Sequence, residues 1–273
     1  MATLGQIIFY SMIALIVLFA AAIILILSLS LSGSKSEVTS SNAFPIANLG
    51  EDKLLSCLLN TATLSTRLQD VSVTWWKEDL SGLVYKYQNG VPDLADQNSQ
   101  FKGRTQLFPD SLGAGNASLM LRSVRSSDEG QYTCSISSSD GGGTVNIHLR
   151  TAAFTAPAFK FSNGVLAAEA SRWFPKPSVT WSNFYGEVLT GNTSFTAISG
   201  GIYSVVSTLL SVNVSDTYNC RIENDFVSAV SRAIPTGSGV SGSTYFMFSA
   251  ASSLLASSYL SIVTAVLCSF YLT

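Results

Sequence analysis

The stretch Asp128-Glu129-Gly130-Gln131-Tyr132-Thr133-Cys134 decides the fold. Gly130 permits a tight turn into a strand, because glycine tolerates backbone conformations that other residues avoid. Tyr132 stands two residues before a cysteine, where its hydroxyl can bond to nearby backbone and close a corner between strands. Cys134 is then placed to cross a two-sheet sandwich to an upstream cysteine. These residues predict a β-sandwich closed by a disulfide.

The partners of this stretch lie upstream. Cys57 precedes Cys134 by 77 positions, a separation typical of a variable-type immunoglobulin domain. The alternation in Val71 to Trp76 places Trp75 inward against the disulfide and Trp76 outward. Arg104 is positioned to form a structural ion pair with Asp128. We therefore predict a V-type domain over residues 36–150 with a Cys57–Cys134 disulfide and a core containing Trp75 and Tyr132.

A second, shorter copy of the pattern follows. Asp216-Thr217-Tyr218-Asn219-Cys220 repeats the corner, and Trp181 takes the place of the core tryptophan. We predict a C-type domain over 152–236, with Trp181 and Tyr218 in its core. Ala168 stands where the partner of Cys220 is expected, so Cys220 is either a buried free thiol or part of a bridge between chains. The second domain is therefore expected to be the less stable of the two.

Both ends of the chain are apolar. Residues 1–34 contain the run Ile7 to Leu31, which suits either a cleaved signal peptide or an uncleaved signal anchor. After Arg232 there is no charged residue. We expect a small-residue stalk over 237–243 and, over 244–273, either a transmembrane helix of a single-pass type I protein or a glycolipid-anchor signal. Either anchor places the domains on the outer face of the cell membrane, without a signalling tail.

The composition excludes several function classes. Charged residues make up 12% of the chain and the net charge is −2, so no nucleic-acid partner is indicated. The single histidine, His148, alternates with Ile147 and Leu149 and is expected to face solvent. No metal site, cofactor site or catalytic constellation can be assembled from these residues, and we predict that the chain is not an enzyme. N-linked glycans are predicted at three acceptors: Asn116, Asn192 and Asn213.

Three features of the first domain suit a protein–protein interface. Trp76 either contacts a partner or lies on the neighbouring strand. Tyr85 and Tyr87 share one face of the strand Leu83 to Gln88, and either face a partner or are half-buried strand residues. The glycine-rich tip Ser137 to Gly143, which includes Asp140, is either an adaptable recognition loop or a plain turn.

Several motifs in order resemble the B7 family of T-cell co-signalling ligands: Gly82-Leu83-Val84, Phe101 to Thr105, Gly115 to Leu119, and Arg172 to Pro175. The resemblance covers nearly the whole chain. It implies a cell-surface ligand, variable domain outermost, that binds a receptor on T cells and restrains activation, proliferation and cytokine output. By analogy it assigns binding to the front sheet, at Trp76, Tyr85, Tyr87 and Asp140. Ala168 departs from the family pattern.

A second hypothesis is a homophilic or junctional adhesion molecule. In that case the three glycans must leave one self-complementary face free. The two hypotheses are separated by testing whether the protein binds activated T cells or only itself.

Overall fold

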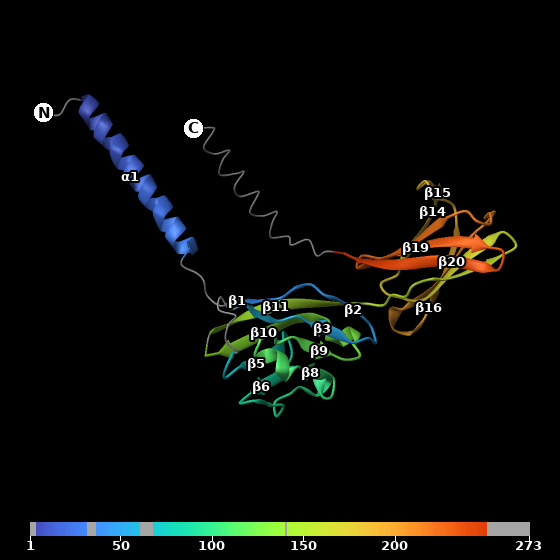
Figure 1. Ribbon diagram of the computed structural model, residues 1–273, viewed down its shortest axis with the longest axis horizontal. Coiled ribbons are helices and arrows are strands. Elements are labelled where there is room, and N and C mark those ends of the chain that lie inside the picture. The colour runs from blue at the N-terminus through green and yellow to red at the C-terminus, as the bar shows by residue number, and fades with distance from the viewer. Residues whose placement is uncertain (1–3, 32–36, 61–67, 140, 250–273) are drawn as a thin grey trace.

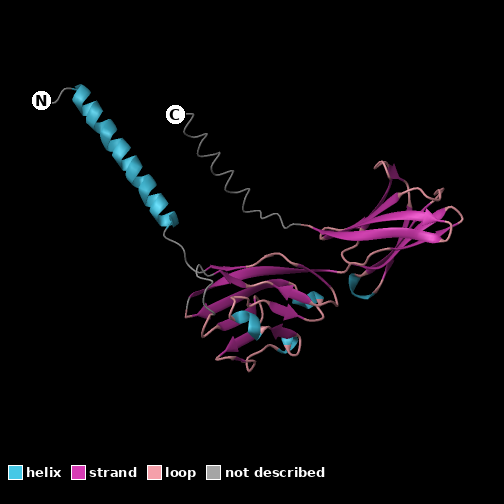
Figure 2. Ribbon diagram, in the orientation of Figure 1, coloured by secondary structure: helices cyan, strands magenta, loops and turns pink. Residues whose placement is uncertain are grey.

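The computed structural model describes residues 4–31, 37–60, 68–139 and 141–249. This part of the chain forms an N-terminal helix and two β-sandwiches (Figure 1). Helix α1 (Leu4–Leu31) covers most of the segment expected to act as signal or anchor. Strands dominate the rest (Figure 2). Within the described ranges, no helix combines the length and apolar character needed to cross a membrane.

The first sandwich is built on a front sheet of six strands in the order β2-β11-β10-β5-β6-β7. A back sheet has the order β3-β9-β8, and β1 pairs with β4. Every pairing is antiparallel except that of β11 with β2. The strands are β1 (Glu37–Thr39), β2 (Ile46–Asn48), β3 (Lys53–Leu55), β4 (Leu58–Asn60), β5 (Ser72–Lys77), β6 (Tyr85–Gln88), β7 (Val91–Pro92), β8 (Thr105–Leu107), β9 (Leu119–Leu121), β10 (Gly130–Ser138) and β11 (Gly141–Ala152). Short helical turns are η1 (Ser99–Phe101), α2 (Pro109–Leu112) and η2 (Ser126–Asp128).

The core of the first sandwich surrounds the disulfide. Cys57 and Cys134 are bonded, with their Cα atoms 6.5 Å apart, as expected from the sequence. Trp75 is fully buried beside them, and its indole N–H donates to the Ala117 carbonyl oxygen at 3.1 Å. The Tyr132 hydroxyl donates to the Asp128 carbonyl oxygen at 2.6 Å, which makes the expected tyrosine corner. Burial of the Tyr132 phenol raises its pKa.

A buried ion pair closes the base of this sandwich. The Arg104 guanidinium donates to both carboxylate oxygens of Asp128, a side chain with no exposed surface. The same guanidinium donates to the carbonyl oxygens of Gln100, Arg122 and Ser123 at 3.1 to 3.2 Å. Burial of the Asp128 carboxyl would raise its pKa, but hydrogen bonds from Arg104, the Arg125 N–H and Gln100 outweigh it and hold the pKa below the ordinary value.

The second sandwich packs a sheet of order β12-β13-β17-β16 against one of order β15-β14-β18-β19-β20. Its strands are β12 (Ala158–Ser162), β13 (Val165–Trp173), β14 (Ser178–Asn183), β15 (Val188–Leu189), β16 (Asn192–Ala197), β17 (Tyr203–Leu209), β18 (Tyr218–Glu223), β19 (Val227–Thr236) and β20 (Gly239–Phe248), with a short turn η3 (Ser199–Gly201). Trp181 is buried, and its indole N–H donates to the Ser207 hydroxyl at 2.8 Å. The Tyr218 hydroxyl accepts from the Asn213 N–H at 3.1 Å.

The second core has no disulfide where the first has one. Cys220 is a buried free cysteine, and Ala168 is buried in the same cluster. Burial raises the pKa of the Cys220 thiol to about 12. The structure therefore has the buried thiol that the sequence allowed.

Residues 239–248 differ from the sequence expectation. The sequence predicts a stalk over 237–243 and the start of the apolar tail after it, but residues 239–248 form strand β20, antiparallel to β19. Val240 and Phe246 pack against the second core, and the hydroxyls of Ser231 and Thr244 lie 2.8 Å apart across the two strands. These contacts explain why a glycine- and serine-rich segment becomes a strand. The rest of the expected tail, 250–273, lies outside the described residues.

The two sandwiches meet at a short junction. Asn48 of the first domain donates to the Phe154 carbonyl oxygen at 3.1 Å, and Arg172 donates to that of Leu49 at 2.6 Å. The Arg150 guanidinium lies 5.4 Å from the centre of the Phe226 ring. Figure 1 shows the two sandwiches joined at this point. Their buried side chains form two separate clusters.

Candidate functional site

The candidate site is the outward face of the front sheet of the first sandwich. Its position follows from the strand register. Thr133 on β10 lies opposite Trp76 on β5 and opposite Asn146 on β11, so these three side chains form one row across the sheet. Ser135 lies opposite both Thr74 and Thr144, and Thr74 lies opposite Lys86 on β6, which makes a second row.

The two rows are polar apart from Trp76, the one large aromatic side chain in them. Trp76 is half-buried, whereas Trp75 next to it is fully buried in the core. The Thr133 hydroxyl donates to the Asn146 side-chain oxygen at 2.9 Å, which orders the surface beside Trp76. Part of the Trp76 side chain is therefore accessible beside these polar residues. Trp76 is the large aromatic side chain of these two rows, and aromatic residues are enriched at protein interfaces.

The charge on the face is largely compensated. The Lys86 ammonium lies 3.1 Å from an Asp93 carboxylate oxygen, and the Gln88 amide donates to the same oxygen at 2.7 Å. Both members of the pair are about one-third exposed, at 29% and 32%, so the pair contributes little to stability. A nearly neutral face with hydroxyl and amide groups suits a polar protein partner better than a highly charged one.

Two of the expected contact residues face the opposite way. Tyr85 and Tyr87 are 6% and 8% exposed and belong to the first core. Their partners across the strand explain this, because Tyr85 lies opposite Trp75 and Tyr87 opposite Val73, both of which point inward. Directly opposed residues share a face of the sheet. The prediction that these tyrosines contact a partner is therefore wrong.

Lys86 takes the outward position on that strand instead. The sequence analysis did not identify Lys86, Thr133 and Asn146. Thr133 and Asn146 follow from the register opposite Trp76, and Lys86 follows from the register opposite Thr74. Asp140, the fourth expected contact residue, lies outside the described residues. On both sides of it, β10 and β11 form a hairpin that pairs Ser138 with Gly141. His148 on β11 is exposed, as expected, and its ring lies 6.4 Å from that of Phe44.

The three glycan acceptors differ in their surroundings. Asn192 and Asn213 are exposed on the second sandwich. Asn116 is half-buried at the edge of the first core, where its side-chain oxygen accepts from the Ser118 N–H at 3.1 Å. None of the three lies on the face around Trp76, so glycans at these positions start from other parts of the surface.

Comparison with known proteins gives consistent matches. Residues 41–150 match the family described as immunoglobulin V-set domain. Human V-set domain-containing T-cell activation inhibitor 1 is 37% identical over 279 residues, which is 98% of this chain and 97% of that protein. The rat protein of the same name (Rattus norvegicus) is 40% identical over 240 residues, 84% of this chain and 83% of that protein. Among solved structures, the human B7-H4 IgV-like domain is 37% identical, covering 42% of this chain and 96% of that one, with a TM-score of 0.39.

Proposed function

The chain belongs to the B7 family of immunoglobulin-superfamily ligands, and from that premise we propose that it acts at the cell surface to restrain T-cell activation. One observation carries the proposal. The chain is 37% identical to human V-set domain-containing T-cell activation inhibitor 1 across 98% of its own length, so both sandwiches and both ends are included. B7 proteins are ligands without catalytic activity, and this chain is accordingly not an enzyme.

The ligand acts by binding a receptor on T cells. We assign the contact to the front sheet of the first domain, with Trp76 at its centre and Thr74, Thr133 and Asn146 around it. Tryptophan is enriched among the residues that contribute most to protein interfaces. The compensated Lys86–Asp93 pair at the edge adds selectivity more than affinity. The second domain serves as a spacer.

The chain is anchored on the outer face of the membrane by its C-terminal segment, either as a single-pass type I protein or through a glycolipid. The absence of any charged residue after Arg232 is compatible with both anchors. Treating intact cells with a phosphatidylinositol-specific phospholipase separates them. Release into the medium excludes the transmembrane anchor, and retention counts against the glycolipid.

The proposed function is tested with cells that display the full chain. They are cultured with activated T cells, and T-cell proliferation and cytokine release are measured against cells without the chain. We expect both to fall. No effect on T cells, together with clustering of the displaying cells through self-binding, would reject the ligand in favour of an adhesion protein.

A further inference from the structure

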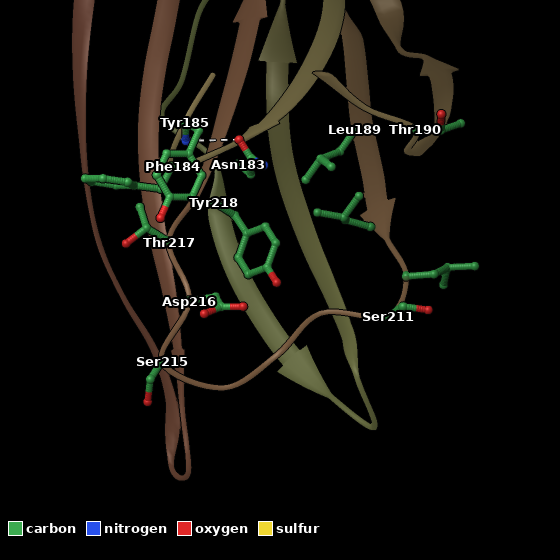
Figure 3. A pocket seen from close by; sticks show the side chains of 12 residues that line it. Asn183, Phe184, Tyr185, Leu189, Thr190, Ser211, Ser215, Asp216, Thr217 and Tyr218 are labelled. Carbon is green, nitrogen blue, oxygen red and sulfur yellow. Dashed lines mark hydrogen bonds between the residues drawn. The ribbon is translucent and has the colours of Figure 1, made fainter. Parts of the chain in front are cut away.

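A hollow lies at the end of the second sandwich away from the first. It has a volume of about 710 Å³ and lies between the β14–β15 turn and the loop that joins β17 to β18 (Figure 3). Strand β18 begins at Tyr218, in the wall of the hollow, and the turn beyond its other end brings Phe226 against Arg150 of the first domain. The hollow is therefore separated from the domain junction by the length of that strand.

One wall is an aromatic turn held rigidly away from the sandwich. Phe184 and Tyr185 are 65% and 86% exposed, and their rings meet edge to face at 5.5 Å. The Asn183 side-chain oxygen accepts from the N–H groups of Tyr185 and Glu187, at 3.0 Å each, and its amide donates to the Glu187 carboxylate at 2.7 Å. Large exposed aromatic residues in an ordered turn indicate a surface that something covers.

A glycosylation acceptor borders the opposite wall, which includes Ser215 and Asp216. Asn213-Val214-Ser215 fits the acceptor pattern, and this loop is tied to the tyrosine corner because the Asn213 N–H donates to the Tyr218 hydroxyl at 3.1 Å. The Asn213 side-chain nitrogen donates to the Asp216 carboxylate at 3.0 Å, and Asp216 lines the hollow. A sugar would be attached to that same nitrogen, so the glycan begins at the rim.

We propose that the N-linked glycan on Asn213 folds back into this hollow and covers Phe184 and Tyr185. The C–H faces of sugar rings carry partial positive charge and suit the negative faces of aromatic rings. Sugar hydroxyls find partners in the Asp216 carboxylate, the Thr217 hydroxyl and the Asn183 amide, all in the wall. The volume lies within the roughly 300–1,000 Å³ of small-molecule sites. The proposal requires export through a glycosylating compartment, and it is independent of the T-cell receptor.

The test measures how fast Tyr185 is oxidised. The full chain is produced in mammalian cells, purified in detergent and exposed to hydroxyl radicals, and oxidation of the peptide containing Phe184 and Tyr185 is followed by mass spectrometry. The variant Ser215→Ala removes the acceptor pattern while leaving Asn213 and its hydrogen bonds in place. Ser194→Ala is the matched control, because it removes the Asn192 acceptor in the same domain.

We expect Asn213 to carry a glycan and Tyr185 to be oxidised several-fold faster in Ser215→Ala than in the wild type or in Ser194→Ala. In wild-type protein treated with a glycosidase, Tyr185 should be oxidised as fast as in Ser215→Ala. This sample tests the proposal without a substitution, in case Ser215→Ala folds poorly. An unoccupied Asn213, or equal oxidation with and without the glycan, overturns the proposal. The proposal is also overturned if phosphatidylcholine vesicles or a higher protein concentration slow the oxidation of Tyr185 in Ser215→Ala to the wild-type rate. A lipid surface or a second copy of the chain would then be the occupant of the hollow.

Discussion

The variant Ala168→Cys should install the disulfide that the second domain lacks. Ala168 and Cys220 are both fully buried in one core. Their surroundings match those of the existing disulfide, because Cys220 lies opposite Trp181 as Cys134 lies opposite Trp75. In the second domain, Ala168 lies opposite Ser207, whose hydroxyl accepts a hydrogen bond from the Trp181 indole. In the first domain, Cys57 is likewise next to the residue that binds the core tryptophan: its carbonyl oxygen accepts from the Ala117 N–H, and the Ala117 carbonyl oxygen accepts from the Trp75 indole.

The expected gain follows from the length of the loop. Residues 168 and 220 are separated by 220 − 168 = 52 positions. Closing a loop of this size reduces the entropy of the unfolded chain by an amount equivalent to about 4 kcal/mol at 25 °C. Strain in engineered bonds commonly lowers the gain, so we expect about 2–4 kcal/mol. For a domain of this size that raises the unfolding midpoint by roughly 10–30 °C.

Calorimetry of full-length Ala168→Cys should show a higher unfolding midpoint for the second domain and an unchanged midpoint for the first domain. The matched control is Ala168→Cys combined with Cys220→Ala, which keeps the added sulfur but cannot form the bond. Maleimide labelling in denaturant without reductant should label Cys220 in the wild type and not in Ala168→Cys. Labelling of Cys220 in Ala168→Cys would show that the two positions cannot be bridged. A bond that forms without raising the unfolding midpoint above that of the control would show that closing this loop does not stabilise the domain.

Further predictions concern three buried polar groups. The pKa of Asp128 is lower in the folded state than in the unfolded chain. The contribution of Asp128 to the unfolding free energy is therefore present above the unfolded pKa of about 3.9 and is lost as pH falls through the folded pKa. Acid titration of the wild type against Asp128→Asn checks this dependence. Asp128→Asn should also lower the unfolding free energy of the first domain by about 3–5 kcal/mol near neutral pH, because it leaves Arg104 buried without its partner. Tyr132→Phe should cost about 1–3 kcal/mol in denaturant unfolding, since the phenol that bonds the Asp128 carbonyl is lost. The Cys220 thiol should resist maleimide at pH 8 in the folded protein, because it is buried and its pKa is raised to about 12; labelling as fast as in denaturant would contradict this.

The parts of the fold that the sequence predicted are those where a residue type has a single chemical requirement. A core tryptophan beside a cysteine, a corner tyrosine and a buried Arg–Asp pair each need one particular partner. Their spacing was therefore enough to place Trp75, Tyr132, Arg104 and Asp128 correctly.

The orientation of Tyr85 and Tyr87 depends on a long-range contact instead. Val84 and Tyr85 are consecutive and both buried, so the alternation changes phase just where β6 begins. Only the pairing of β6 with β5 fixes which side chains face inward. Tyrosine also suits either face, and the pattern Tyr-Lys-Tyr-Gln does not decide between them.

Strand β20 was missed for a related reason. Its glycine and serine residues give no alternating apolar pattern, and small residues near a chain end are typical of a stalk. The strand is stabilised by the edge of β19 and by Val240 and Phe246 against the second core. Its formation depends on a neighbouring strand, which local sequence does not reveal.

We propose that the face around Trp76 delivers the inhibitory signal to T cells. The most direct measurement compares cells displaying the full chain as wild type, Trp76→Ala or Leu54→Ala, at equal surface levels, for their effect on T-cell proliferation. Leu54 is the control because it is 45% exposed on β3, in the other sheet of the same domain. Loss of a central tryptophan commonly costs about 2 kcal/mol or more, which weakens binding by roughly 30-fold. We predict that Trp76→Ala abolishes suppression and that Leu54→Ala retains it. Full suppression by Trp76→Ala would show that the signal does not depend on this face.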